Sequence, residues 1–148
     1  MASYLIDTNV LLRLARKVDA QYPLVKAAIS ELENRRSVLC FSLQNIVEFW
    51  NVCTRPVDRN GFGLGTEETA RMVEAIERTM TLLPDNEAVY TAWKRIVTKH
   101  QVSGVKVHDA RLAAIMEVHG VDQIRTFNQA DFERFKNVMA IHPTEIAQ

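Results

Sequence analysis

Short apolar runs alternate with longer amphipathic stretches along the chain of 148 residues. Each short run is too brief for a helix, and polar or turn-forming residues follow it, which is typical of a buried strand. The strands predicted in this way are residues 3–6, 38–41, 81–83, 123–127 and 138–141.

Between these runs, apolar side chains recur at the three- and four-residue spacing that places them on one face of a helix. The helices predicted from this spacing are residues 8–17, 23–36, 43–54, 66–80, 86–100 and 109–119. In the third of them, the buried face is expected to include Ile46, Val47, Trp50 and Cys53. Thr66 is expected to cap the fourth, because a threonine hydroxyl can accept a hydrogen bond from a free N–H at a helix start.

Strands separated by helices favour a parallel sheet with helices on both faces. The sequence therefore predicts an α/β fold, a three-layer α/β/α sandwich with a central parallel sheet, in one domain that covers residues 1–148. In such sheets functional groups gather beyond the carboxyl ends of the strands. The residues that follow each strand are therefore the first place to look for chemistry.

Charge and cysteine content narrow the function classes. Eighteen basic and eighteen acidic residues balance, so a nucleic-acid role would need a local cluster of charge. No apolar run approaches the ~18 residues that cross a bilayer, and the first residues lack the features of a signal peptide, so we expect no membrane partner. Cys40 and Cys53 lack metal-ligand spacing, and we expect buried free thiols in a reducing, cytoplasmic compartment.

Three acidic residues occupy positions where chemistry is expected. Asp7 follows the first strand, Glu48 lies inside an apolar helix, and Asp109 opens a later helix. Each has a structural alternative: a helix cap for Asp7, a solvated helix edge for Glu48, and a first-turn acid favoured by the helix dipole for Asp109. An acid among apolar neighbours is costly unless something neutralises it, which favours a functional role.

Taken together, these acids predict a metal site. Their expected positions lie at one rim of the sheet on three different elements, and clustered carboxylates repel one another unless a cation lies between them. The four histidines and two cysteines show no zinc-type spacing such as HExxH or CxxC. Oxygen ligands select hard cations that handle phosphate oxygens, so the expected cofactor is Mg²⁺ or Mn²⁺.

Four segments, in this order, resemble the PIN-domain ribonucleases: YLIDTNVLL, SLQNIVEFWNV, HDARLAAIMEVHG and IRTFNQADF. The similarity extends over essentially the whole chain and is greatest to the VapC-like toxins of bacterial toxin–antitoxin systems. The resemblance implies a PIN-like α/β/α sandwich and an endoribonuclease that hydrolyses RNA phosphodiester bonds with Mg²⁺ or Mn²⁺. It also implies a homodimer and a small antitoxin protein as a partner.

The resemblance assigns roles to individual residues. Asp7, Glu48 and Asp109 match the family's three acids, which are catalytic and bind the metal. Thr8 and Asn9 match the polar residues that follow the first acid, and they are expected to assist it.

A fourth position departs from the family pattern. It falls just after Thr126, an auxiliary polar residue, where many relatives have an aspartate and this chain has Asn128. Asp131, three residues further on, either substitutes in part or only caps a turn. The neutral amide leaves open whether the site holds one metal ion or two.

Basic residues are expected to bring RNA to an acidic site. Arg13, Lys106, His108 and Arg111 are the candidates, with a solvated helix face as the alternative for each. Phe62 lies in the glycine-rich loop 55–65, where it can stack on a base, dock a partner or pack back onto its own core.

Two other functions compete with the nuclease. The first is a catalytically weak or inactive RNA-binding or scaffold protein on the same fold, of which Asn128 would be a symptom. The second is a phosphatase or phosphotransfer domain with Asp7 as the nucleophile. The second is disfavoured because no second aspartate follows Asp7 at two positions on.

Overall fold

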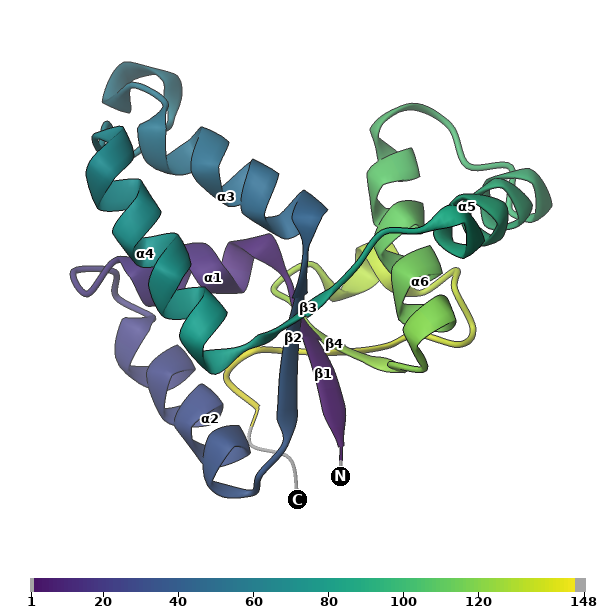
Figure 1. Ribbon diagram of the computed structural model, residues 1–148, viewed down its shortest axis with the longest axis horizontal. Helices are drawn as coiled ribbons and strands as arrows, with labels where there is room; N and C mark the ends of the chain where they lie inside the picture. Colours follow the sequence, from purple (N-terminus) through teal and green to yellow (C-terminus); the bar gives the residue numbers. More distant parts are fainter. Residues whose placement is uncertain (1, 146–148) are drawn as a thin grey trace.

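Five parallel strands form the centre of the molecule (Figure 1). The computed structural model describes residues 2–145, and the order of the strands is β3-β2-β1-β4-β5. The strands are β1 (Ser3–Ile6), β2 (Val38–Ser42), β3 (Thr81–Leu83), β4 (Gln123–Arg125) and β5 (Met139–Ile141). Every neighbouring pair is parallel, which confirms the predicted sheet.

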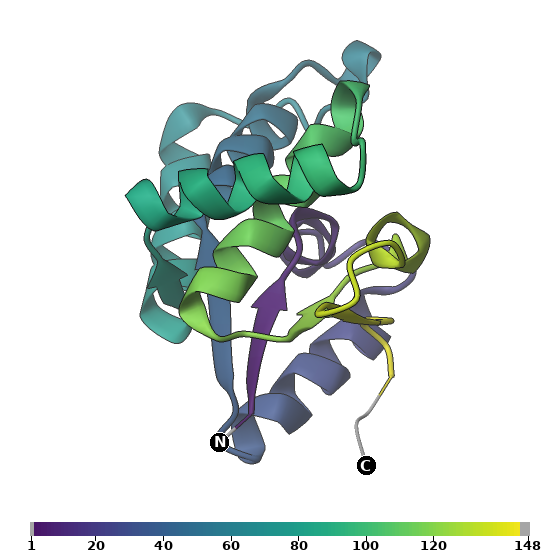
Figure 2. The same cartoon turned by 90° about the vertical axis from the view of Figure 1, so that its right-hand side faces the viewer.

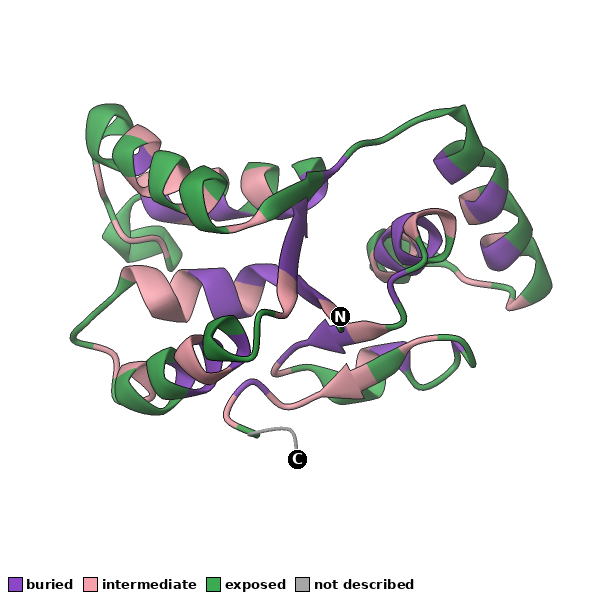
Figure 3. Ribbon diagram, turned by 60° about the horizontal axis from the view of Figure 1, so that its bottom comes forward, coloured by how far each residue is buried: buried purple, intermediate pink, exposed green. Residues whose placement is uncertain are grey.

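Helices cover both faces of this sheet. Helices α1 to α4 lie on one side and α5 and α6 on the other (Figures 1 and 3), and Figure 2 looks onto the α5 and α6 side. The helices are α1 (Thr8–Ala15), α2 (Tyr22–Asn34), α3 (Leu43–Thr54), α4 (Thr66–Thr79), α5 (Glu87–Lys99) and α6 (Val107–His119). Short 3₁₀ helices η1 (Val57–Arg59), η2 (Gly104–Lys106) and η3 (Gln129–Phe132) lie in the connections. The predicted three-layer sandwich is confirmed.

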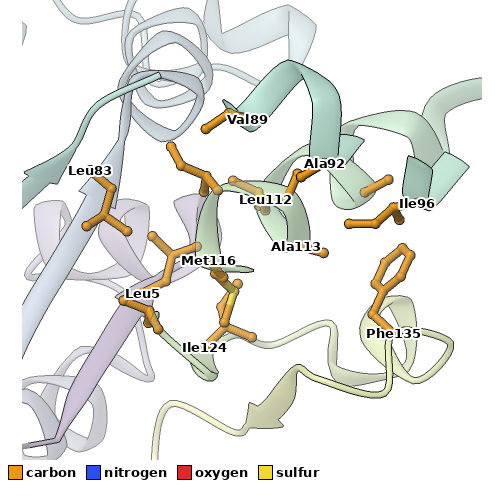
Figure 4. Packing of buried hydrophobic residues seen from close by; sticks show 14 of the residues in the cluster. Leu5, Leu83, Val89, Ala92, Ile96, Leu112, Ala113, Met116, Ile124 and Phe135 are labelled. Carbon is orange, nitrogen blue, oxygen red and sulfur yellow. The ribbon is translucent and has the colours of Figure 1, made fainter. Parts of the chain in front are cut away.

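Each face of the sheet has its own apolar core. Leu5, Met116 and Ile124 are buried in the core under α5 and α6 (Figure 4). Ile6 and Phe49 are buried in the core under α1 to α4. Successive residues of a strand point to opposite faces, so the central strand β1 contributes to both cores. This double burial explains why β1 reads as a continuous apolar run.

The carboxyl ends of β1, β2 and β4 lie at one edge of the sheet. Asp7 follows β1, Ser42 ends β2, and Thr126 follows β4. Because β1 lies between β2 and β4, Asp7 stands between the other two residues. The N–H of Asp7 donates to the carbonyl of Arg125 at 3.0 Å, which continues the sheet to this edge.

The cap of α4 and the start of α6 differ from the prediction, whereas α2 and α5 start within one residue of it. Thr66 is not a cap: Gly65 occupies the N-cap position, and its carbonyl accepts from the backbone N–H of Thr69 at 3.1 Å and from the Thr69 hydroxyl at 2.9 Å. Helix α6 begins at Val107, so Asp109 is its third residue and not its first. The preceding helix η2 runs directly into α6, and this continuous coiling moves the start upstream.

The buried face of α3 also differs from the predicted face. Phe49 and Cys53 are buried together with the polar Gln44 and Asn45, whereas Val47 is 59% exposed. The two polar side chains hydrogen-bond to neighbouring elements at the carboxyl edge of the sheet. With those bonds, Gln44 and Asn45 lie inside, while Leu43 and Val47 lie outside.

The extent of burial tests the predictions made for the two cysteines and for Phe62. Cys40 and Cys53 are buried and free, as predicted, and burial raises the pKa of Cys53 to about 11. Phe62 packs against the core under α1 to α4, with the guanidinium carbon of Arg16 at 4.5 Å from the ring centroid. Its packing onto its own core is therefore the alternative that holds. Among residues 2–145, no helix has both the length and the apolar character needed to cross a membrane.

Candidate functional site

Asp7 caps α1 and is buried at the carboxyl edge of the sheet. Only 8% of the surface of this residue is exposed. Oδ1 accepts from the backbone N–H of Thr8 at 2.8 Å, and Oδ2 accepts from the hydroxyl of Thr126 at 2.8 Å. The cap predicted as an alternative therefore exists, and the same carboxylate also enters a polar cluster. Its two hydrogen bonds hold it in one orientation.

The fully buried Thr126 connects Asp7 to two other segments. Its Oγ1 accepts from Nδ2 of Asn9 at 3.3 Å and from the backbone N–H of Asn128 at 3.0 Å. A hydroxyl has one proton and two lone pairs, so these contacts require the proton to point at Asp7. The N–H of Phe127 donates to Oδ1 of Asn9 at 3.3 Å, and β4 ends before the predicted residue 127. The cluster thus favours an ionised Asp7 that only accepts.

A capping box at the start of α3 carries Glu48 toward the same edge. Ser42 and Asn45 bond reciprocally through side chain and backbone, and Nδ2 of Asn45 donates to Oγ1 of Thr8 at 3.1 Å. The Thr8 hydroxyl in turn donates to Oε1 of Glu48 at 3.2 Å. Glu48 is exposed and lies one helical turn after Asn45. This chain of hydrogen bonds links the first two predicted acids.

The third predicted acid, Asp109, lies in the first turn of α6. Nε2 of Gln44 donates to the carbonyl of His108 at 3.0 Å, which ties α3 to the first turn of α6. Asp109, the next residue, is half-buried, and the His108 side chain is exposed. Asp131 of η3 accepts from Nζ of Lys106 at 2.6 Å. Gln44 therefore brings the first turn of α6, with Asp109, next to the start of α3, and Lys106 holds Asp131 beside that turn.

The electrostatics of Asp7 reflect its burial. Burial raises the pKa of its carboxyl group, while the hydrogen bonds from Thr126 and Thr8 lower it. The negative charges of Glu48 and Asp131 raise it further, and the net shift is upward. These two acids are therefore close enough to disfavour the charge on Asp7.

The pKa of Asp109 is also raised, first by burial and then by the charge of Asp131. Lys106 and His108 oppose the shift, and Asp7 adds to it. The charge of Asp7 thus raises the pKa of Asp109, and the charge of Glu48 raises the pKa of Asp7. The three predicted acids therefore share one region of negative potential. A cation placed among them would stabilise the charged form of each.

The carboxylate oxygens of the three acids are the type of ligand that Mg²⁺ or Mn²⁺ prefers. Within residues 2–145, no three side chains of His, Cys, Asp or Glu form a ready group that could hold a metal ion. Mg²⁺ keeps several waters and is commonly held by one or two carboxylates, so direct contact with all three acids is not required. A carboxylate has about four lone-pair positions, so Asp7 retains acceptor capacity beyond its two protein bonds. Glu48, being exposed, has room to turn toward an ion.

Three of the four basic residues expected to bind RNA are held in ion pairs: Lys106 with Asp131, as described above, and the two arginines with other aspartates. Arg13 contacts Asp19 at 2.6 Å, and its guanidinium carbon lies 5.0 Å from the ring centroid of Phe127. Arg111 contacts Asp85 at 2.6 Å. Both arginine pairs are partly exposed, so a phosphate could share these guanidinium groups without burying a new charge.

Two residues that organise the site were not predicted from the sequence. Asn45 and Gln44 organise the approach of α3, yet neither belongs to a charged or metal-binding motif. Ser42 followed three residues later by a side chain that can bond back is the spacing of a capping box, which would have pointed to Asn45. No local signal marks Gln44, because its partner lies 64 residues away.

Comparisons with known proteins give one family and several similar structures. The family model described as the PIN domain matches residues 4–138. The crystal structure of VapBC2 from Rickettsia felis bound to a promoter DNA fragment is similar, with a TM-score of 0.68, 14% identity, and coverage of 95% of this chain and 98% of that chain. No curated protein sequence matches.

Two further solved structures have the same fold. VapBC-1 from nontypeable Haemophilus influenzae gives a TM-score of 0.68 at 18% identity, with coverage of 97% of this chain and 99% of that chain. VapC20 from Mycobacterium tuberculosis, described as a sarcin-ricin loop cleaving toxin, gives 0.61 at 18% identity, with coverage of 89% and 95%.

Proposed function

We propose that this chain, which belongs to the PIN domain family, is a metal-dependent endoribonuclease that hydrolyses RNA phosphodiester bonds. The observation that carries the proposal is the buried carboxylate of Asp7, held as an acceptor by Thr8 and Thr126 and coupled to other acids. A helix cap alone would not need such acids around it. Their mutual repulsion supports a site that is completed by a cation.

In this proposal Asp7, Glu48 and Asp109 hold Mg²⁺ or Mn²⁺, directly or through water. The ion, when bound, lowers the pKa of water and offsets charge on phosphoryl oxygens. Asp7 is the fixed acceptor, because the Thr126 hydroxyl orients it. Glu48 or Asp109 orients the attacking water and accepts its proton on a carboxylate oxygen. The water oxygen bonds to phosphorus as the P–O3′ bond breaks, and the leaving 3′-oxygen takes up a proton from solvent. Thr8 supports this role for Glu48 by donating to its Oε1.

The residues at the fourth position of the family pattern, Asn128 and the nearby Asp131, bear on the number of metal ions. Asn128 is exposed and cannot supply a second negative charge, and Asp131 is engaged by Lys106. We therefore propose one firmly held ion. Arg13, Lys106, His108 and Arg111 remain the proposed contacts to RNA phosphates.

The biological setting belongs to the same proposal: the toxin of a toxin–antitoxin pair, a homodimer, acting in the cytoplasm against RNA and bound by a small antitoxin protein. The fold shared with VapC20, described as a toxin, and with VapBC-5 from Mycobacterium tuberculosis, described as a member of the VapBC family of toxin–antitoxin systems, supports it. An inactive RNA-binding or scaffold protein is the second candidate. The neutral Asn128 favours that alternative.

The test compares wild type with Asp7→Asn on a panel of structured RNAs in Mg²⁺, Mn²⁺ or EDTA. We expect cleavage by wild type in Mg²⁺ or Mn²⁺, none in EDTA, and none by Asp7→Asn, whose circular dichroism remains that of a folded protein. Asp58→Asn, which removes an exposed acid of η1, is the matched control and should retain activity. Cleavage by Asp7→Asn at the wild-type rate would refute the mechanism, and metal-independent RNA binding without cleavage would favour the second candidate.

A further inference from the structure

A cavity of about 350 Å³ lies between α5 and the start of α6, on the side of the molecule that Figure 2 faces. Its lining residues are Asp85, Asn86, Val89, Tyr90, Trp93 and Arg111. This volume is within the range of sites that bind small molecules, roughly 300–1,000 Å³. None of the functions assigned to the acids uses it.

Two aromatic side chains form one wall of the cavity. Tyr90 is 59% exposed, and Trp93 is partly exposed. They are three residues apart on α5 and therefore occupy neighbouring positions on one helix face. The indole N–H of Trp93 donates to the carbonyl of Val107 at 2.9 Å, which holds the ring in place. Val107 begins α6, two residues before Asp109, so this wall is anchored at the candidate site.

Polar groups stand at the rim. Arg111 contacts Asp85 through one guanidinium nitrogen at 2.6 Å, and a guanidinium has five N–H donors in all. Asn86 caps α5 by accepting the N–H of Val89 at 3.0 Å through Oδ1, and its amide nitrogen carries two more donors. The rim thus combines the paired charges of Arg111 and Asp85 with amide donors, beside the exposed side chain of Tyr90.

The position of the cavity relates it to the proposed catalytic edge. Asp85 follows β3, and Asp7 follows β1, which is two strands away in the sheet. Neighbouring strands are about 4.8 Å apart, so these strand ends are separated by roughly 10 Å. A nucleic-acid strand that passes Asp7 can therefore reach the cavity with an adjacent part of its chain.

We propose that this cavity is a subsite for one unpaired nucleobase of single-stranded RNA, next to the phosphodiester that is cleaved. The inference rests on the proposed ribonuclease function. Unpaired bases stack on tyrosine and tryptophan rings, and arginine contacts phosphate or stacks as well, which matches both the wall and the rim.

The first experiment measures RNA binding in the Asp7→Asn background, so that cleavage does not interfere. The probe is a short single-stranded oligoadenylate, and the ligand control is the same oligomer without bases. Loss of one stacking contact should weaken binding by Tyr90→Ala roughly 5- to 150-fold. Tyr90→Phe keeps the ring and should bind like its parent. The abasic oligomer should bind the parent and Tyr90→Ala equally.

A second measurement observes the cavity directly. The chain has two tryptophans, so Trp50→Phe leaves Trp93 as the only indole. Stacking of a base should quench the Trp93 fluorescence on addition of oligoadenylate, whereas the abasic oligomer should not quench it.

The outcomes separate the subsite from the nuclease proposal. Equal binding of oligoadenylate by Tyr90→Ala and its parent, or no quenching of Trp93, would overturn the subsite even if wild type cleaves RNA. Base-dependent quenching and weakened binding by Tyr90→Ala would support the subsite even if no metal produces cleavage. In that last case the nuclease proposal fails and the chain is an RNA-binding protein.

Discussion

The two sides of the candidate site are built differently. On one side, Asp7 is buried and both of its oxygens accept hydrogen bonds, with the fully buried Thr126 behind it. On the other side, Glu48 is exposed and Asp109 is half-buried in the first turns of α6. One side is therefore rigid, whereas the other has space to rearrange.

This difference suggests how such a site can be prepared for a cation. Burial and neighbouring acids raise the pKa of Asp7, so keeping its carboxylate charged costs stability. The hydrogen bonds from Thr8 and Thr126 offset part of that cost and fix the geometry. The exposed acid can then turn toward an ion when it arrives. A fixed first ligand and adjustable partners allow entry without a preformed cage.

The largest effect after the loss of Asp7 is expected from Asp109→Asn. Removing a ligand of the proposed ion should reduce cleavage about 100-fold or more, since a bound metal stabilises the transition state by several kcal/mol. The fold should remain, because Asp109 is only half-buried. The measurement is the single-turnover rate in Mn²⁺, with the exposed Asp122→Asn as the control. A rate within a few-fold of wild type would remove Asp109 from the site.

Thr126→Val tests whether the rigid side matters. The variant keeps the shape but removes the donor to Asp7 and the acceptor for Asn9 and Asn128. We expect metal affinity or activity to fall roughly 10–100-fold. The free energy of unfolding should fall by about 1–3 kcal/mol, because buried polar groups lose their partner. Titration with Mn²⁺ and urea unfolding measure the two effects. Thr126→Ser, which restores the hydroxyl, should recover most of both.

The pH dependence of stability distinguishes the two states of Asp109. Its folded-state pKa is raised above the ordinary value of 3.8, so the folded protein holds the proton more tightly than the unfolded chain. Its stabilising contribution is complete below the unfolded pKa and is lost as pH rises through the folded pKa. In EDTA, the free energy of unfolding of Asp109→Asn minus that of wild type should therefore increase as pH rises from about 4 toward neutrality. A decrease of this free-energy difference with rising pH would contradict the raised pKa of Asp109. Saturating Mn²⁺ should stabilise wild type more than the variant.

The smallest effect is expected from Asn128→Asp, which adds an acid at an exposed position. Its backbone N–H already bonds to Thr126, so the side chain can change without disturbing the rigid side. We expect Mn²⁺ affinity to rise a few-fold, or a second binding event, since an added negative charge near the ion favours it. Isothermal titration calorimetry measures both. An unchanged isotherm would mean that position 128 lies outside the metal site.

Local patterns along the chain were enough for the class of fold and for the first acid. The run at residues 3–6 is apolar because β1 is buried on both faces, and Asp7 follows it directly. Alternating runs and amphipathic segments are sufficient for a parallel sheet with helices on both sides, since both periods are properties of neighbouring residues. The motifs around Glu48 and Asp109 likewise lie within single segments.

Contacts between segments far apart in the sequence account for the rest. Burial of Val47 was predicted wrongly, whereas Cys53 is buried as predicted; hydrogen bonds from Gln44 and Asn45 to residues of α6 and α1 place these polar side chains inside instead. The role of Thr126 as the partner of Asp7 joins residues 119 positions apart. Such pairings depend on the order of strands and the packing of helices, which no periodicity in a single segment encodes. The chain alone therefore indicates which acids are available, and the folded arrangement sets which one is rigid and which can move.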